Sequence, residues 1–210
     1  NSSKQERDKL KRSQDSAYAY YNRGGARANQ GDLDSAIDDY TKAINLNPND
    51  DVAYYNRACI RADQGNLDSA IADYTKAIEI NPNDADSYHN RGTTCYSQGD
   101  LDSAIADYTK AIEINPNDAA PYYCRGCVRA DQGNLDSAIA DHTKAIEINP
   151  NFAEPYLSRG YIRADQGNLD SAIVDFTQDL EINPNDHVAY YNRGNVRADQ
   201  GNLDSAIADY

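Results

Sequence analysis

The stretch that decides the fold is GNLDSAIADYTKAIEINPND, residues 65–84. Its segment LDSAI returns every 34 residues, beginning at Leu33, Leu67, Leu101, Leu135, Leu169 and Leu203. A strict period of this length is typical of proteins in which each repeat is one supersecondary unit that stacks on its neighbours. We therefore divide the chain into a charged N-terminal segment, 1–16, and a solenoid, 17–210. The repeats of the solenoid are 17–50, 51–84, 85–118, 119–152, 153–186 and the partial 187–210.

Each repeat is expected to form two helices joined by a short turn. In residues 85–118, apolar or small residues recur at three- and four-residue spacing before Gly99 and again after it, which is the pattern of a helix with one buried face. Asp100, or its counterpart Asn66, can cap the second helix through its side-chain oxygen. Pro116 ends that helix because proline cannot continue the hydrogen-bond ladder. The sequence thus predicts an all-α protein of antiparallel helix pairs.

These helix pairs resemble the tetratricopeptide repeat. In the third repeat, the family pattern is carried by Tyr88, Gly92, Ala104, Tyr108, Ala111 and Pro116. The resemblance extends over residues 17–210 and implies a right-handed superhelical solenoid, with an inner wall built by the first helix of each pair. It also implies a non-catalytic scaffold for protein–protein interaction rather than an enzyme.

Arginines stand at two positions where the family usually has a leucine and an aromatic residue. The first position is arginine in every repeat: Arg23, Arg57, Arg91, Arg125, Arg159 and Arg193. The second is arginine in every repeat except the third, which has Cys95: Arg27, Arg61, Arg129, Arg163 and Arg197. They could form a ligand-binding ladder, but every second helix also supplies an aspartate: Asp39, Asp73, Asp107, Asp141, Asp175 and Asp209. Because buried charges are almost always paired, we expect structural Arg–Asp pairs within each repeat.

The resemblance implies that repeat positions 2, 5, 6, 9, 12 and 13 line the inner wall, and we take our candidates from positions 5, 6 and 13. These positions hold our candidate peptide-binding residues: Tyr21, Asn22, Tyr55, Asn56, Asp63, His89, Asn90, Tyr123, Asp131, Asp165, Tyr191 and Asn192. A row of side-chain amides can donate to and accept from the main chain of an extended peptide, while tyrosines add rigid apolar area. The acidic rim favours a peptide that carries Lys or Arg.

The charge balance narrows the choice of partner. The chain has 34 acidic and 20 basic residues, and a formal net charge of −14, which disfavours nucleic acid. No run approaches the roughly 18 apolar residues of a membrane span, so we expect no membrane partner. The compartment stays open, with the cytoplasm slightly favoured.

Two other functions remain open at this point. The chain could be an accessory or regulatory module of a larger enzyme or assembly, which the full-length sequence would reveal. Alternatively, Cys124 and Cys127 of a C-x-x-C motif could join His89 in a metal or redox site, if a fourth ligand came from outside. Because no second C-x-x-C is present, we predict no metal and no cofactor. We also find no catalytic signature.

The C-terminal helix presents a further surface. In this sequence no repeat follows to cover Leu203, Ala206, Ile207 and Tyr210. Repeat stacks normally need a polar capping element for solubility. We therefore expect self-association through these residues.

Overall fold

The computed structural model describes the backbone of residues 2–210 and the side chains of residues 4–7 and 11–210. The described residues form α-helices and no strand, which confirms the prediction of an all-α protein. The chain divides into two compact units, Asn1–Ile114 and Asn115–Tyr210, and each is described by itself.

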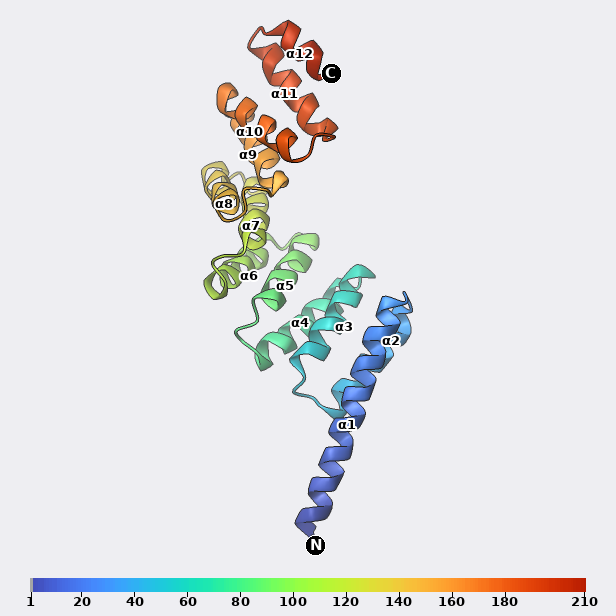
Figure 1. Ribbon diagram of the computed structural model, residues 1–210. Helices are drawn as coiled ribbons and strands as arrows, with labels where there is room; N and C mark the ends of the chain where they lie inside the picture. Colours follow the sequence, from blue (N-terminus) through green and yellow to red (C-terminus); the bar gives the residue numbers. More distant parts are fainter. Residues whose placement is uncertain (1) are drawn as a thin grey trace. The chain divides into compact units, whose positions relative to one another are not determined.

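The described part of unit 1 consists of helices that lie in pairs (Figure 1). They are α1 (Ser2–Asn29), α2 (Leu33–Leu46), α3 (Asp51–Asp63), α4 (Leu67–Ile80), α5 (Ala85–Ser97) and α6 (Leu101–Ile114). Helix α1 packs on α2, α3 on α4 and α5 on α6. Neighbouring pairs meet where α2 packs on α3 and α4 packs on α5.

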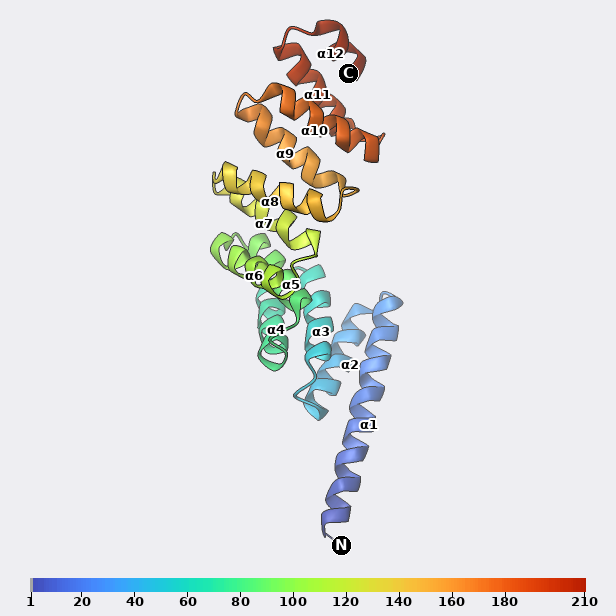
Figure 2. The same ribbon diagram turned by 60° about the vertical axis from the view of Figure 1, so that its left-hand side comes forward.

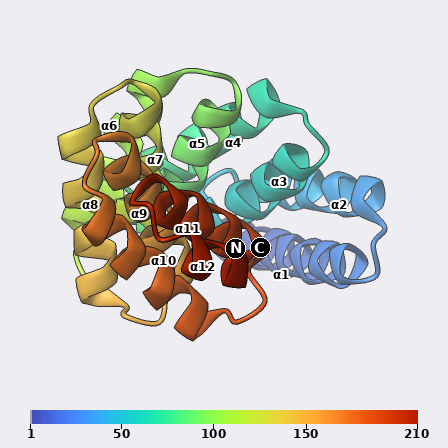
Figure 3. The same ribbon diagram turned by 90° about the horizontal axis from the view of Figure 1, so that it is seen from above.

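Unit 2 repeats this arrangement. Its helices are α7 (Ala119–Asp131), α8 (Leu135–Ile148), α9 (Ala153–Asp165), α10 (Leu169–Ile182), α11 (His187–Asp199) and α12 (Leu203–Asp209). The pairs α7–α8, α9–α10 and α11–α12 pack internally, and α8 packs on α9 and α10 on α11. Figure 3 shows α9, α10 and α11 side by side in this unit. In both units, the second helix of one pair therefore supports the first helix of the next.

The first helix is longer than its counterparts. The charged segment expected at 1–16 is helical from Ser2 and continues without a break into residues 17–29. Figure 2 shows the N-terminal half of α1 extending past the end of α2. The Ser13 hydroxyl donates to the Leu46 carbonyl oxygen at 3.4 Å, at the level where α2 ends.

Glycine makes the turn inside each pair. Gly65 has a φ of +78°, a left-handed conformation that glycine adopts at no steric cost. After this turn, the Asn66 N–H donates to the Arg61 carbonyl oxygen at 2.8 Å. Asp100 accepts from the Ser103 N–H at 3.1 Å and caps α6 as predicted. The same prediction is wrong for Asn66, whose side chain donates to Gln64 instead of capping α4.

A buried aspartate holds each pair together. Arg57 donates from Nε to Asp73 Oδ2 at 2.8 Å and from Nη2 to Oδ1 at 2.7 Å, and Arg61 Nη1 adds a bond of 2.7 Å to Oδ2. The carboxylates equivalent to Asp73 are all almost inaccessible to solvent: Asp39, Asp107, Asp141, Asp175 and Asp209. The expected Arg–Asp pairs are confirmed in all six repeats.

The same arginine also reaches the neighbouring pair. Arg57 Nη1 donates to the Thr41 hydroxyl of the preceding repeat at 2.9 Å, and the equivalent bond joins Arg159 to Thr143 at the same distance. Each threonine hydroxyl in turn donates to a helix carbonyl one turn earlier, as Thr41 does to Ile37 at 2.7 Å. One guanidinium therefore links two helices of its own pair and one helix of the pair before it.

Two buried side chains in unit 2 carry polar atoms without a hydrogen-bond partner. His142 of α8 occupies the place of the core tyrosines Tyr74 and Tyr108, is fully buried, and neither of its ring nitrogens has a hydrogen-bond partner. Asp179 of α10 stands where the other complete repeats have alanine; it is 1% exposed, and its Oδ2 is unpaired. A buried polar atom without a partner costs free energy, so both residues weaken unit 2.

Burial of His142 makes the stability of unit 2 depend on pH. Burial lowers the pKa of His142 to about 4, well below the about 6.5 of an unfolded histidine. The folded state therefore prefers the neutral ring, so this contribution is complete above pH 6.5 and is lost as the pH falls toward 4. Wild type should lose about 3 kcal/mol of unfolding free energy over this window relative to His142→Tyr. Urea unfolding of both proteins at several pH values measures this difference, and a constant difference down to pH 4 would contradict it.

The Asp179→Ala variant should be more stable than wild type at pH 7. Burial, followed by the nearby charges of Asp186 and Glu154, raises the pKa of Asp179 to about 6. Keeping this carboxylate ionised in the folded state at neutral pH is therefore unfavourable, and alanine already fits the equivalent sites. We expect a gain of about 1–2 kcal/mol at pH 7 that shrinks as the pH falls below 6 and the acid becomes protonated. Thermal unfolding at pH 7 and pH 5 checks this, and a variant less stable than wild type at pH 7 would refute it.

Candidate functional site

The predicted peptide-binding residues lie on the first helices of the pairs, and the faces that carry them are here called the candidate wall. In unit 1 the wall comprises Tyr21 and Asn22 on α1, Tyr55, Asn56 and Asp63 on α3, and His89 and Asn90 on α5. In unit 2 it comprises Tyr123 and Asp131 on α7, Asp165 on α9, and Tyr191 and Asn192 on α11. The candidate wall therefore has one part in each unit.

In unit 1 the asparagines and tyrosines bond to each other across neighbouring repeats. Asn56 Nδ2 donates to the Tyr21 hydroxyl at 3.2 Å, and Asn90 Nδ2 donates to the Tyr55 hydroxyl at 2.7 Å. Each amide thus spends part of its donor capacity inside the protein, which sequence reasoning did not foresee. The carbonyl oxygen of each amide is left for a ligand, and so is the second N–H of Asn56, whereas Asn90 Nδ2 also donates to Cys59 Sγ at 4.0 Å.

The tyrosines of unit 1 also rest on the core. The rings of Tyr21 and Tyr40 are 5.8 Å apart between centroids, and those of Tyr55 and Tyr74 are 5.9 Å apart in an edge-to-face arrangement. Burial is the main cause that raises the pKa of Tyr55, so its hydroxyl keeps its proton at neutral pH. These rings are therefore held rigidly, with one face packed and the hydroxyl toward the next repeat.

In unit 2 the wall is less regular. The Tyr123 ring contacts His142 at 5.7 Å and Phe152 at 5.1 Å between centroids. Tyr191 is 60% exposed and packs only loosely on Tyr210, with 6.2 Å between the ring centroids. The wall of unit 2 therefore offers more uncovered aromatic surface at Tyr191 than at Tyr123.

A pocket of about 200 Å³ joins two of the predicted residues in unit 2. Asp165 of α9 and Asn192 of α11 both line it, together with Tyr161, Asn195 and Asp199. Asn192 corresponds to Asn90, but the preceding repeat has Leu157 where Asn90 finds the Tyr55 hydroxyl. Among the described side chains, Asn192 has no hydrogen-bond partner, so its whole amide is open to a ligand.

The candidates chosen from the sequence left out Tyr161 and Asn195, although their repeat position was expected on the inner wall. Both occupy repeat position 9, at which the other repeats have small residues such as Gly25 and Cys59. Tyr161 is 55% exposed, and Asn195 accepts a bond of 2.8 Å from the Tyr210 hydroxyl. The replacement of small residues by Tyr161 and Asn195 at this position is the sequence signal that could have identified them.

The acidic rim residues are accessible. Asp63, Asp131 and Asp165 are all exposed at or next to the C-terminal ends of their helices. Asp63 lies in unit 1, and the other two lie in unit 2. Exposed carboxylates attract cations over a distance of about 8–10 Å at physiological ionic strength, so they can select a basic ligand.

Three of the four residues expected to support self-association are exposed. Leu203 is 62%, Ile207 71% and Tyr210 66% exposed, whereas Ala206 is 2% exposed. The expectation is therefore wrong for Ala206, which lies on the inward side of α12. Self-association through the other three stays a prediction.

The alternative metal or redox site would be built on His89 and the two cysteines of the C-x-x-C motif. The described residues contain no group of three or more His, Cys, Asp and Glu side chains arranged to hold a metal ion. None of the four cysteines forms a disulfide, and burial raises the pKa of Cys127, which disfavours a reactive thiolate. None of the described helices has the length and apolar character needed to cross a lipid bilayer.

The fold and the wall together define a helical-repeat protein. Profiles described as "Tetratricopeptide repeat" match residues 17–50, 52–84, 119–152 and 73–106, and one described as "TPR repeat" matches 92–133 and 160–201. The chain belongs to the tetratricopeptide repeat family. This repeat is generally a non-catalytic module for protein interaction, so the chain is a protein-interaction scaffold at that level of description. No curated protein matches the sequence.

Solved structures with the same fold include MamA, which is 28% identical, has a TM-score of 0.74, and aligns over 77% of this chain and 94% of its own. A second is YrrB, described as "a TPR protein with an unusual peptide-binding site", at 28% identity and a TM-score of 0.68 over 81% of this chain and 88% of its own. The pilF protein of Pseudomonas aeruginosa has a TM-score of 0.81 at 16% identity, over 94% and 90% of the two chains, and shows the fold alone.

The difference between Asn90 and Asn192 can be tested by stability. Asn90→Ala removes the bond to the Tyr55 hydroxyl and should lower the unfolding free energy by about 0.5–1.5 kcal/mol. Asn192→Ala removes an amide without a partner and should leave the unfolding free energy unchanged. Parallel urea unfolding of the two variants measures the contrast, and equal losses would show that the two amides have the same structural role.

Proposed function

We propose that the protein binds an extended peptide segment carrying Lys or Arg, through the candidate wall. The proposed binding surface comprises all the residues of the candidate wall. The observation that carries it is the pocket in unit 2, where the unpaired amide of Asn192 lies close to the carboxylate of Asp165 and the exposed ring of Tyr161.

The chemistry of this pocket suits a basic peptide in three ways. The Asn192 amide can pair with one peptide group of an extended main chain whatever the sequence of the ligand. The exposed Tyr161 ring offers apolar area and a face for a cation. Asp165 and Asp199 supply two negative charges, so a lysine or arginine side chain is favoured over an acidic one.

The wall of unit 1 can bind a peptide in the same way, but fewer of its amide hydrogen-bonding groups are available to the ligand. Asn56 keeps a carbonyl oxygen and one N–H and Asn90 keeps a carbonyl oxygen, while their bonds to the tyrosines fix the orientation of the amides. Fixed groups lose little conformational entropy when a ligand binds, which favours affinity. Asp63 supplies the negative charge in this part.

A lysine- or arginine-containing peptide should bind more tightly than the same peptide with acidic residues in their place, and its affinity should fall as salt is raised. Fluorescence anisotropy with a library of labelled peptides measures both effects. Asn192→Ala and Asp165→Asn should each weaken the binding of the best basic peptide by at least about fivefold, the loss of one or two good polar contacts.

Glu147→Gln is the matched control. Glu147 lies on α8, outside the candidate wall, and pairs with Lys144 at 3.0 Å. The change removes one negative charge from the same unit, as Asp165→Asn does, and should leave the affinity nearly unchanged. A library without any preference for basic peptides would contradict the proposal, and so would equal losses in Asp165→Asn and Glu147→Gln.

A further inference from the structure

Asp107 of α6 holds one guanidinium where its counterparts hold two. In the five other repeats a second arginine donates from Nη1 to the buried carboxylate at 2.7 or 2.8 Å: Arg27, Arg61, Arg129, Arg163 and Arg197. The third repeat has Cys95 at this position. Among the side chains that the structure describes, Asp107 therefore accepts from Arg91 alone, at 2.7 Å on Oδ1 and 2.8 Å on Oδ2.

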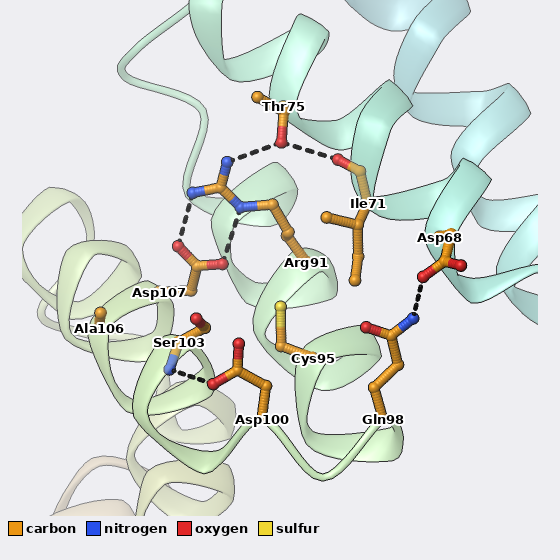
Figure 4. Close-up of a pocket in the computed structure, with 10 residues that line it drawn as sticks. All are labelled: Asp68, Ile71, Thr75, Arg91, Cys95, Gln98, Asp100, Ser103, Ala106 and Asp107. Carbon is orange, nitrogen blue, oxygen red and sulfur yellow. Dashed lines mark hydrogen bonds and ion pairs between the residues drawn. The ribbon is translucent and has the colours of Figure 1, made fainter.

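A pocket of about 450 Å³ lies where the missing side chain would be. Its walls come from α4, α5 and α6, and both Cys95 and Asp107 line it. Figure 4 shows the short Cys95 side chain in the middle of this space, with Ser103 and Asp100 on one side and Gln98 and Asp68 on the other. The rim residues Asp68, Gln98 and Asp100 are exposed, so the space opens to the surface. Its volume lies within the range of ligand-binding pockets.

The hydrogen-bond acceptors for a guanidinium are already in place. In the first repeat Arg27 Nη1 donates both to Asp39 Oδ2 and, at 3.5 Å, to the Ser35 carbonyl oxygen. In the sixth repeat Arg197 makes the same pair of bonds, with a distance of 3.4 Å to the Ser205 carbonyl oxygen. Ser103 is the counterpart of these serines and lines the pocket beside Asp107. A guanidinium that entered here would meet the acceptors that its equivalents use elsewhere in the chain.

The charge of the pocket favours a cation. Asp68, Asp100 and Asp107 line it against the single cation Arg91, which is already paired with Asp107. Hydrogen bonds from the Ser103 side chain and backbone lower the pKa of Asp100, so this carboxylate stays ionised at neutral pH. Burial, with a smaller effect of Asp107 and Asp100, raises the pKa of the Cys95 thiol, which is therefore a small neutral wall.

We propose that this pocket binds the guanidinium group of an arginine side chain presented by a partner protein, which takes the place of the arginine that the third repeat lacks. The planar guanidinium suits the site better than an ammonium, because it can donate to Asp107 and to the Ser103 carbonyl at once. The site is separate from the candidate wall, since none of the wall residues lines it. It would hold whether or not a peptide binds that wall.

The direct test uses ethylguanidinium, which has the atoms of an arginine side chain beyond Cβ. Titration followed by two-dimensional NMR should give saturable shifts of the backbone amides of residues 95–107 in wild type. Cys95→Arg fills the pocket from within and should abolish these shifts. Ethylammonium, with the same charge and no planar fork, should bind at least about fivefold more weakly. Absence of saturable binding to wild type, or binding that persists in Cys95→Arg, would overturn the proposal.

A variant in unit 2 provides the matched gain of function. Arg163→Cys combined with Asn168→Asp removes the second arginine from Asp175, supplies the counterpart of Asp100, and so recreates in the fifth repeat the arrangement of the third. This variant should acquire a second set of ethylguanidinium shifts, around Asp175. If it is folded, as judged by its spectrum, and gains no such shifts, the missing arginine is not what creates the site and the proposal fails.

The source of the guanidinium can be distinguished with two further probes. An arginine blocked at both ends by acetyl and methylamide groups imitates a side chain within a protein. Free arginine adds an α-ammonium and an α-carboxylate to the same guanidinium, and a pocket that recognises the side chain alone should bind it no more tightly than the blocked form. Tighter binding of free arginine would assign the pocket to the amino acid itself and refute the partner-protein proposal.

Discussion

The structure depends on a carboxylate that is buried in the second helix of every pair. Burying the charge of Asp73 or its counterparts without a cationic partner would cost several kcal/mol, and the first helix supplies such partners through Arg57 and Arg61. The geometry of this bidentate pair sets how the two helices face each other. Because Arg57 also bonds to Thr41, the same constraint reaches the preceding repeat. The Tyr54 ring packs under the Arg57 guanidinium, with 5.6 Å between the guanidinium carbon and the ring centroid.

The same constraint explains what changes in a repeat that lacks one member of this interaction. Where a repeat keeps both arginines, the space beside the aspartate is filled, as around Asp73. Where Cys95 replaces the second arginine, the acceptors remain and the space opens. In the same way, Leu157 in place of a tyrosine leaves Asn192 without the partner that Asn90 has. In both places, the proposed binding site lies where one member of a repeated interaction is missing while its partners remain.

The sequence predicted the part of this arrangement that repeats. The period of 34 residues, the glycine turns and the prolines indicate the helix pairs, and Arg57 and Asp73 recur at fixed positions, so their pairing followed from the cost of buried charge. The bond between Asn90 and Tyr55 could not be predicted, because it joins residues 35 apart whose distance depends on how two pairs stack. Ala206 was misjudged for a related reason: spacing groups it with Leu203 and Ile207, but only packing shows that it faces inward. Cys95 was visible as an exception, yet its consequence required the backbone around Asp107.

A double-mutant cycle on Arg57 and Asp73 tests the central role of the buried pair most directly. The cycle compares the unfolding free energies of wild type, Arg57→Leu, Asp73→Ala and the double variant in urea. If the pair holds the repeat together, each single change should cost about 3–5 kcal/mol, since it leaves a charge without its main partner. The double variant should then be more stable than the sum of the two losses predicts, by about 2–3 kcal/mol. Losses that simply add would contradict the account, because they would show that Arg57 and Asp73 stabilise the fold independently of each other.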